Sequence, residues 1–156
     1  MLINFIRTTK LSIMPKKGSS GSAAYDLYSV ENKILRARAA TLVSVGIKME
    51  IPPSLFGKIE GRSGMAYRFN VHVGGGVIDS DYRGEIQVIL LNNGNKDFHG
   101  ELSELPMIQY CLLVLAGMAI AQIIFLPRIE ISLVETKTLM STERGENGFG
   151  STDTSK

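Results

Sequence analysis

Short runs of apolar and β-branched residues, separated by glycine, proline and asparagine, make up most of this chain. The runs with the strongest strand character span residues 41–51, 56–60, 70–73, 85–92 and 120–125. No long segment repeats its apolar residues at the helical period, and the sequence contains no internal repeat. Many short strands joined by turns predict an all-β barrel or sandwich.

The end of the chain has a different character. Residues 141–156 are polar, rich in glycine, serine and threonine, and have no pattern that would face a core. The total length of 156 residues fits one domain with a sizeable core. We therefore expect one β-barrel domain over residues 1–140, followed by a mobile arm over residues 141–156.

Composition and charge narrow the function classes. A formal net charge of +2 is too small to indicate nucleic-acid binding. The lone Cys111 excludes an intrachain disulfide and, without a signal peptide, predicts a cytoplasmic or nuclear location, with organelle targeting left open. The uncharged stretch 105–127 is long enough to span a membrane. Pro106, Gln109 and Gln122 interrupt it, so we expect no membrane partner.

The strongest candidate for chemistry is the cluster at residues 74–84. Three consecutive glycines allow the main chain to approach a ligand closely, and Asp79, Asp81 and Tyr82 follow at once. This pattern favours a hairpin that grips a planar ring with main-chain groups and presents a carboxylate as general base. A glycine-rich hairpin with a solvated acidic turn is the alternative.

Four further clusters are less specific taken singly. Residues 24–27 place Asp26 in a strand, and residues 61–66 place Arg62 and a glycine-flanked serine where they can bind phosphate oxygens or form a surface turn. Residues 117–122 end in Gln122, which can be a chance polar residue of a strand. Residues 144–152 put an aromatic side chain into a glycine-rich arm, where it can close over a planar group.

Taken in this order, the clusters resemble the five motifs of the homotrimeric dUTP diphosphatase (dUTPase) family, and the resemblance covers roughly residues 11–153. It implies an all-β, dUTPase-like β-barrel (a distorted jelly roll) that hydrolyses dUTP to dUMP and pyrophosphate. In that family, a water molecule attacks the α-phosphorus in line with the leaving group, and Mg²⁺ is the cofactor. The resemblance also implies a homotrimer whose active sites are shared between subunits.

The resemblance assigns a role to each site residue. Asp79 would be the general base, Tyr82 would stack on deoxyribose and exclude a 2′-hydroxyl, and Asp26 would touch the Mg²⁺ shell through water. The hairpin would read uracil through main-chain groups, residues of the second and fourth motifs would hold phosphates, and the arm would form a lid. The substrate-binding residues so implied, besides Asp79 and Tyr82, are Arg62, Ser63, Gly64, Met65, Gly76, Val77, Ile78, Gln122, Arg144, Phe149, Gly150, Ser151 and Thr152.

The chain departs from the family pattern in several places. Ala24 and Gly61 replace a usual glycine and proline, and Met118 and Ala119 replace a charged pair. Residues 100–113 resemble an insertion, since joining their flanks would restore the family spacing. An alternative is therefore a catalytically impaired dUTP-binding or regulatory protein. A dCTP deaminase-type protein, which shares the fold, is disfavoured by the intact Asp79–Tyr82 pair.

Overall fold

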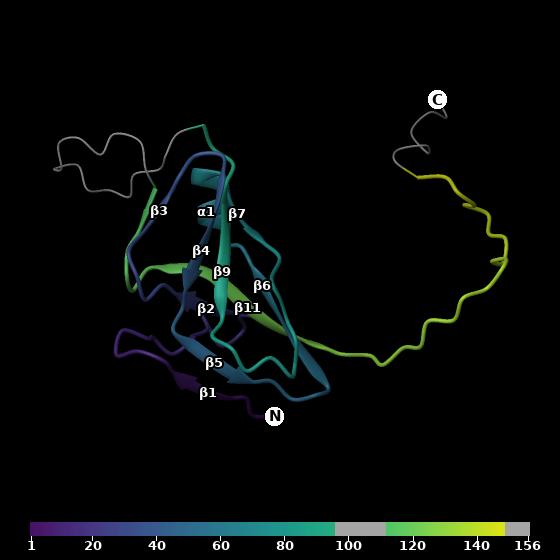
Figure 1. Ribbon diagram of the computed structural model, residues 1–156, viewed down its shortest axis with the longest axis horizontal. Coiled ribbons are helices and arrows are strands. Elements are labelled where there is room, and N and C mark those ends of the chain that lie inside the picture. Colours follow the sequence, from purple (N-terminus) through teal and green to yellow (C-terminus); the bar gives the residue numbers. More distant parts are fainter. Residues whose placement is uncertain (96–111, 149–156) are drawn as a thin grey trace.

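The computed structural model describes residues 1–95 and 112–148, and it is almost entirely β in structure (Figure 1). Its single helix within those ranges is α1, Ser63–Phe69. The predicted all-β fold is thereby confirmed. In chain order the strands are β1 (Asn4–Arg7), β2 (Tyr25–Tyr28), β3 (Lys33–Leu35), β4 (Ala39–Ser44), β5 (Ile47–Glu50), β6 (Leu55–Glu60), β7 (Val71–Gly74), β8 (Val77–Ile78), β9 (Gln87–Asn92), β10 (Leu112–Val114) and β11 (Ala119–Pro127).

The strands form four sheets in which every pairing is antiparallel. The largest has the order β2-β11-β6-β8, and a three-stranded sheet has the order β4-β9-β7. Two smaller sheets pair β1 with β5 and β10 with β3. Because neighbours in the largest sheet come from distant parts of the sequence, the fold brings the predicted motifs together only through long-range pairing.

The core lies between faces of the two larger sheets. In β9, Val88 and Leu90 are buried while Gln87 and Ile89 are exposed, which is the alternation expected of a strand with one buried face. The buried residues of both sheets belong to one hydrophobic cluster, whose largest fully buried members are Leu27, Leu35, Ile47, Ile51, Ile86, Leu90, Ile120, Ile123, Val43, Val45 and Val71.

The continuous strand predicted over residues 41–51 is two strands, β4 and β5, because the chain turns at Gly46. Gly46 has φ +65°, a left-handed conformation that favours glycine. A Cβ there would lie 2.3 Å from the Ser12 Oγ, and this hydroxyl donates a hydrogen bond of 2.7 Å to the Gly46 carbonyl. The turn sends the chain out of the three-stranded sheet to pair with β1.

Helix α1 was not expected, since a turn was the structural alternative for residues 61–66. Met65 is buried and anchors the helix to the core. Asn70 ends the helix in a left-handed conformation at φ 53°, with its N–H bonded to the Ala66 carbonyl at 3.0 Å. Seven residues hold only two turns, too few to display a helical period in the sequence.

Two structural boundaries lie near those of the predicted domains. β10 begins at Leu112, inside the predicted insertion 100–113, and pairs with β3 up to the fully buried Val114; residues 100–111 lie outside the described residues. The chain leaves the sheets after β11, and residues 128–147 are exposed, so the extended segment begins before residue 141 (Figure 1). None of the helices in the described ranges is long and apolar enough to cross a membrane.

Candidate functional site

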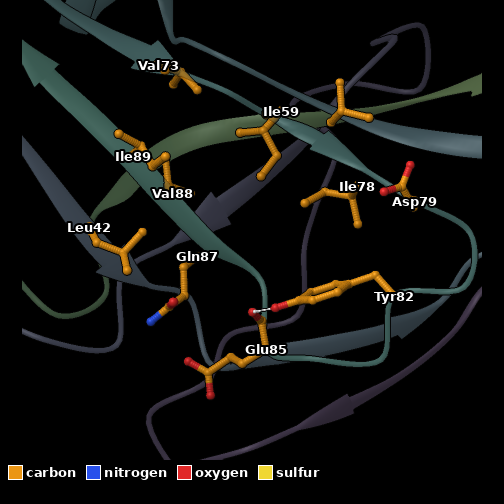
Figure 2. A pocket seen from close by; sticks show the side chains of 13 residues that line it. Leu42, Ile59, Val73, Ile78, Asp79, Tyr82, Glu85, Gln87, Val88 and Ile89 are labelled. Carbon is orange, nitrogen blue, oxygen red and sulfur yellow. Dashed lines mark hydrogen bonds between the residues drawn. The ribbon is translucent and has the colours of Figure 1, made fainter.

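The glycine-rich hairpin forms one wall of a cavity of about 270 Å³ (Figure 2). Its lining combines the hairpin with residues of β4, β6, β7 and β9 and of the turn before β9: Leu42, Ile59, Val73, Gly74, Gly76, Val77, Ile78, Asp79, Tyr82, Glu85, Gln87, Val88 and Ile89. Of the residues predicted from the third motif, the cavity brings together Gly76, Val77, Ile78, Asp79 and Tyr82.

The geometry of β8 directs main-chain groups toward the free edge of its sheet. β8 is the last strand of the order β2-β11-β6-β8, and Val77 stands opposite Lys58 of β6. The Ile59 N–H donates to the Gly76 carbonyl at 2.7 Å, so Val77 and Lys58 form a non-hydrogen-bonded pair. The N–H and C=O of Val77 therefore point away from β6, where they can meet the polar edge of a planar ligand.

Gly76 is essential to this arrangement. It has φ +100°, and a Cβ there would lie 2.7 Å from the Ile59 carbonyl oxygen, a main-chain atom that cannot swing aside.

We expect Gly76→Ala to lower the free energy of unfolding by about 1–3 kcal/mol, through backbone strain and the clash with β6. Urea denaturation measures the change. Gly21→Ala is the matched control, because a Cβ at Gly21 meets nothing within 4 Å. Equal stability of the two variants would contradict this account of the hairpin.

Asp79 and Tyr82 lie in the turn that follows β8. The Tyr82 N–H donates to the Asp79 carbonyl at 3.2 Å, and both side chains are exposed. Figure 2 shows the Tyr82 ring reaching back toward Glu85, and the Tyr82 hydroxyl donates to the Glu85 carbonyl at 2.9 Å. A carboxylate and an aromatic ring thus flank the same cavity, as a general base and a stacking platform would.

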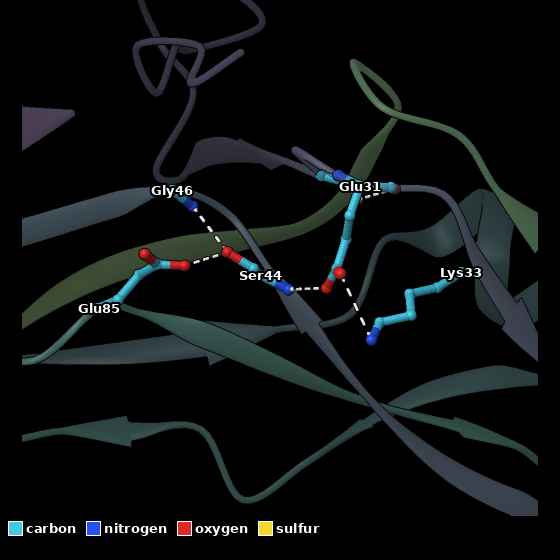
Figure 3. Close-up of polar contacts among 6 residues, drawn as sticks. Glu31, Lys33, Ser44, Gly46 and Glu85 are labelled. Carbon is cyan, nitrogen blue, oxygen red and sulfur yellow. Dashed lines mark hydrogen bonds and ion pairs between the residues drawn. The ribbon is translucent and has the colours of Figure 1, made fainter. Parts of the chain in front are cut away.

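Glu85 was not among the predicted site residues, and its side chain is held on both oxygens. Ser44 Oγ donates to Oε1, and Thr8 Oγ1 donates to Oε2 at 2.7 Å (Figure 3 shows the Ser44 contact). These two hydrogen bonds, that from Ser44 being the larger cause, lower the pKa of Glu85 below its ordinary value of 4.5 against the opposing effect of burial. The carboxylate form is therefore stabilised by folding.

A lowered folded-state pKa gives a stability contribution that is complete above the unfolded-state pKa and is lost as pH falls through the folded-state value. We expect the difference in unfolding free energy between wild type and Glu85→Gln to be constant above about pH 5 and to shrink as the pH falls below that through the lowered folded-state pKa. Chemical denaturation at a series of pH values measures it. Ser44→Ala should weaken the same pH dependence of the unfolding free energy. If the unfolding free energies of wild type and Glu85→Gln instead changed in parallel as the pH falls, Glu85 would not be the group responsible.

A second group of predicted residues gathers where β2, β11 and β6 meet. Gln122 of β11 stands opposite Asp26 on one side and Glu60 on the other. Directly opposed residues share a face of the sheet. The Gln122 Nε2 donates to the Gly61 carbonyl at 2.8 Å, and Arg62 Nε lies 3.3 Å from Asp26 Oδ1. The first, second and fourth motifs therefore form one polar cluster.

The same cluster includes the main chain of the altered fourth motif. Arg62 Nη1 donates to the Ala119 carbonyl at 2.9 Å, a contact that does not depend on the side chain of residue 119.

Ser63 and Gly64 are exposed in the first turn of α1, where helical N–H groups have no partner inside the helix, whereas Met65 is buried. Guanidinium, hydroxyl, amide and main-chain N–H groups are suitable ligands for phosphate oxygens.

The fifth motif falls mostly outside the described residues, which do not include Phe149, Gly150, Ser151 and Thr152. Arg144 is described and exposed, and its Nε donates to the Asn147 carbonyl at 3.0 Å, within the arm itself. The cavity lining contains no residue of the Asp26–Arg62–Gln122 cluster and none of the described arm. Within one chain, the predicted site is therefore divided into separate groups.

Several cavity residues had no sequence signal for a site. Leu42 and Ile89 face outward by strand alternation, a pattern that predicts exposure and says nothing about ligands. Glu85 follows the third motif directly, but its contacts to Thr8 and Ser44 depend on long-range packing.

Comparisons with known proteins agree on one family. The dUTPase family model matches residues 10–103. The deoxyuridine 5′-triphosphate nucleotidohydrolase of Swinepox virus is 42% identical over 94% of this chain and 96% of its own length; that of Candida albicans is 42% identical over 95% and 85%. A solved Staphylococcus bacteriophage 80alpha dUTPase, a G164S mutant with dUpNHpp, superposes with a TM-score of 0.82 over 97% of this chain and 98% of that one, at 22% identity. The chain belongs to the dUTPase family.

Proposed function

We propose that this protein hydrolyses dUTP to dUMP and pyrophosphate. The observation that carries the proposal is the cavity beside the glycine hairpin, where Asp79 and Tyr82 flank main-chain groups directed at the free edge of β8. Relatives named deoxyuridine 5′-triphosphate nucleotidohydrolase, matching nearly the full length, support it.

Each group has a defined part in the proposed reaction. Uracil pairs its polar edge with the main chain of residues 76–78, and Tyr82 packs against deoxyribose. Asp79 accepts the proton of the water that attacks the α-phosphorus in line, and pyrophosphate leaves. General base catalysis of this kind contributes a rate factor of roughly 10²–10⁴.

The triphosphate is proposed to bind the Asp26–Arg62–Gln122 cluster, with Ser63 and Gly64 donating to phosphate oxygens. Arg62 supplies positive charge, and the amide of Gln122 supplies a neutral donor. Because the transition state spreads negative charge over the phosphate oxygens, these donors stabilise it more than the ground state.

Mg²⁺ is the proposed cofactor. No three His, Cys, Asp or Glu side chains among residues 1–95 and 112–148 are grouped to hold a metal ion. Mg²⁺ usually retains several waters and binds through one or two carboxylates plus substrate phosphates. Asp26, beside the phosphate-binding Arg62, fits contact through one of those waters, and the ion would neutralise phosphate charge.

We further propose a homotrimer whose active sites combine groups from different subunits. The separation of the cavity from the Asp26–Arg62–Gln122 cluster within one chain supports this arrangement. Exposed apolar residues of the segment that follows β11 (Ile129, Ile131 and Leu133) support burial against other copies. Light scattering should give three chain masses in solution; a monomer that is fully active would exclude shared sites.

The deciding experiment measures pyrophosphate release from dUTP by the purified full-length protein, with dTTP, dCTP and UTP as comparison substrates and with Mg²⁺ present or chelated. We expect Mg²⁺-dependent turnover of dUTP and strong discrimination against the other three. Tight binding of dUTP without turnover would instead support the regulatory alternative that the predicted insertion at residues 100–113 raises.

A further inference from the structure

The position of the Tyr82 ring depends on the two residues that follow the third motif. The Tyr82 hydroxyl donates to the Glu85 carbonyl at 2.9 Å. The ring also packs directly over Gly84, because a Cβ at Gly84 would lie 2.3 Å from the Tyr82 Oη and 2.4 Å from its Cζ. The ring is therefore held by main-chain features of residues 84 and 85, and Figure 2 shows the hydrogen bond to Glu85.

The main chain at Glu85 is in turn fixed to the scaffold through its side chain and through the peptide unit that it shares with Ile86. Ser44, at the end of β4, and Thr8, just after β1, donate hydrogen bonds to the two carboxylate oxygens. Ser44 is itself positioned, since its N–H donates to Glu31 Oε1 at 2.9 Å and Glu31 pairs with Lys33 at 3.3 Å (Figure 3). The buried Ile86 follows, with its N–H bonded to the Ile47 carbonyl at 2.8 Å.

We propose that Glu85 is a positioning residue for Tyr82 and so contributes to discrimination against ribonucleotides. The inference rests on the proposed function, in which the ring packs against the sugar. The Glu85 carbonyl that holds the Tyr82 hydroxyl is fixed from two sides. The Ile86 N–H of the same peptide unit bonds to Ile47, and the anchored Glu85 side chain holds the residue on its other side. A ring held at this end cannot rotate to make room for a 2′-hydroxyl, whereas a freed ring can.

The kinetic test compares kcat/KM for dUTP and UTP in wild type, Glu85→Ala, Glu85→Gln and Glu50→Ala. We expect Glu85→Ala to lower the dUTP-to-UTP selectivity by about threefold to tenfold, the effect of lost hydrogen bonds on one segment. This loss of selectivity should appear mainly in KM and not in kcat, because the variant leaves the proposed general base Asp79 unchanged. Glu85→Gln should restore selectivity, because its amide can both accept and donate and each partner hydroxyl can do the same.

Glu50→Ala is the matched control for a purely structural role. Glu50 Oε2 accepts a hydrogen bond of 3.0 Å from Asn4 of β1, so this variant also removes a carboxylate that ties the N-terminal strand to the body. It should leave selectivity unchanged. Unchanged selectivity in Glu85→Ala, or the same loss in Glu50→Ala, would overturn the proposal.

A readout without substrate separates failure of this inference from failure of the proposed function. In protein labelled with ¹³C at its tyrosine rings, Tyr82→Phe identifies the Tyr82 resonance by its disappearance. That resonance should shift in Glu85→Ala and stay in place in Glu50→Ala. An unmoved resonance in Glu85→Ala shows that Glu85 does not hold the ring, even where the wild type proves unable to hydrolyse dUTP.

Discussion

Replacing Asp79 with asparagine is expected to reduce the turnover of dUTP by roughly 10²–10⁴ while nucleotide binding is retained. The amide has nearly the shape of the carboxylate but cannot accept the proton of the attacking water. The turn should persist, because its hydrogen bond from the Tyr82 N–H ends on the Asp79 main-chain carbonyl. Pyrophosphate release at saturating dUTP measures turnover, and calorimetric titration with a non-hydrolysable dUTP analogue measures binding.

Asp81→Asn provides the control for this substitution. Asp81 is exposed in the same turn, two residues along the chain, and is not among the residues that line the cavity. It changes the local charge by the same amount as Asp79→Asn without removing the proposed base. Equal turnover of wild type and Asp79→Asn, or an equal loss in both variants, would show that Asp79 is not the base.

The fold class could be predicted because β-branched and apolar residues mark single segments as strands. Which face is buried was less clear: Val88 and Leu90 point into the core, but the outward-pointing Ile89 is also apolar. The shortest strands could not be predicted from the sequence of a single segment. β8 has two residues and β3 and β10 have three each, too few to carry a recognisable period.

The grouping of the site residues could not be derived from local pattern. Asp26 and Gln122 meet because β2 and β11 pair in one register, and a shift by one residue would send one of them to the opposite face. No property of either segment alone determines that register. The resemblance to a known family predicted that these residues belong to one site. Glu85 belongs to none of the motifs, and only its contacts to Thr8 and Ser44 in the structure identify it.

The described residues after β11 make mostly local hydrogen bonds and expose apolar side chains. Beyond the hydrogen bonds that Arg128 makes to the Pro53 and Ser54 carbonyls, those found in the described residues after β11 are local, such as Thr136 to Thr138 and Arg144 to Asn147. The apolar residues Ile129, Ile131 and Leu133 are all more than 70% exposed. The exposure of these apolar residues supports the proposal that another copy of the chain contacts this segment.

Truncation before Arg144 is therefore expected to lower kcat/KM for dUTP by roughly 10²–10³, the scale of losing preorganised donors to developing charge. The removed residues include Arg144 and the phosphate-binding and aromatic groups that the family resemblance assigns to a lid, and a lid also excludes water. The melting temperature should change little, because the described part of the removed segment is exposed and bonded locally. Activity assays and thermal denaturation measure the two effects.

A second truncation, after Pro127, separates catalysis from assembly. The shorter truncation keeps Ile129, Ile131 and Leu133, so the trimer mass should persist in light scattering while activity is lost. The longer one removes this apolar segment, and we expect it to weaken association, because exposed apolar side chains gain stability only when a partner buries them. Dissociation already on truncation before Arg144 would mean that the last residues hold the trimer together, and full activity after that truncation would mean that no lid is needed for hydrolysis.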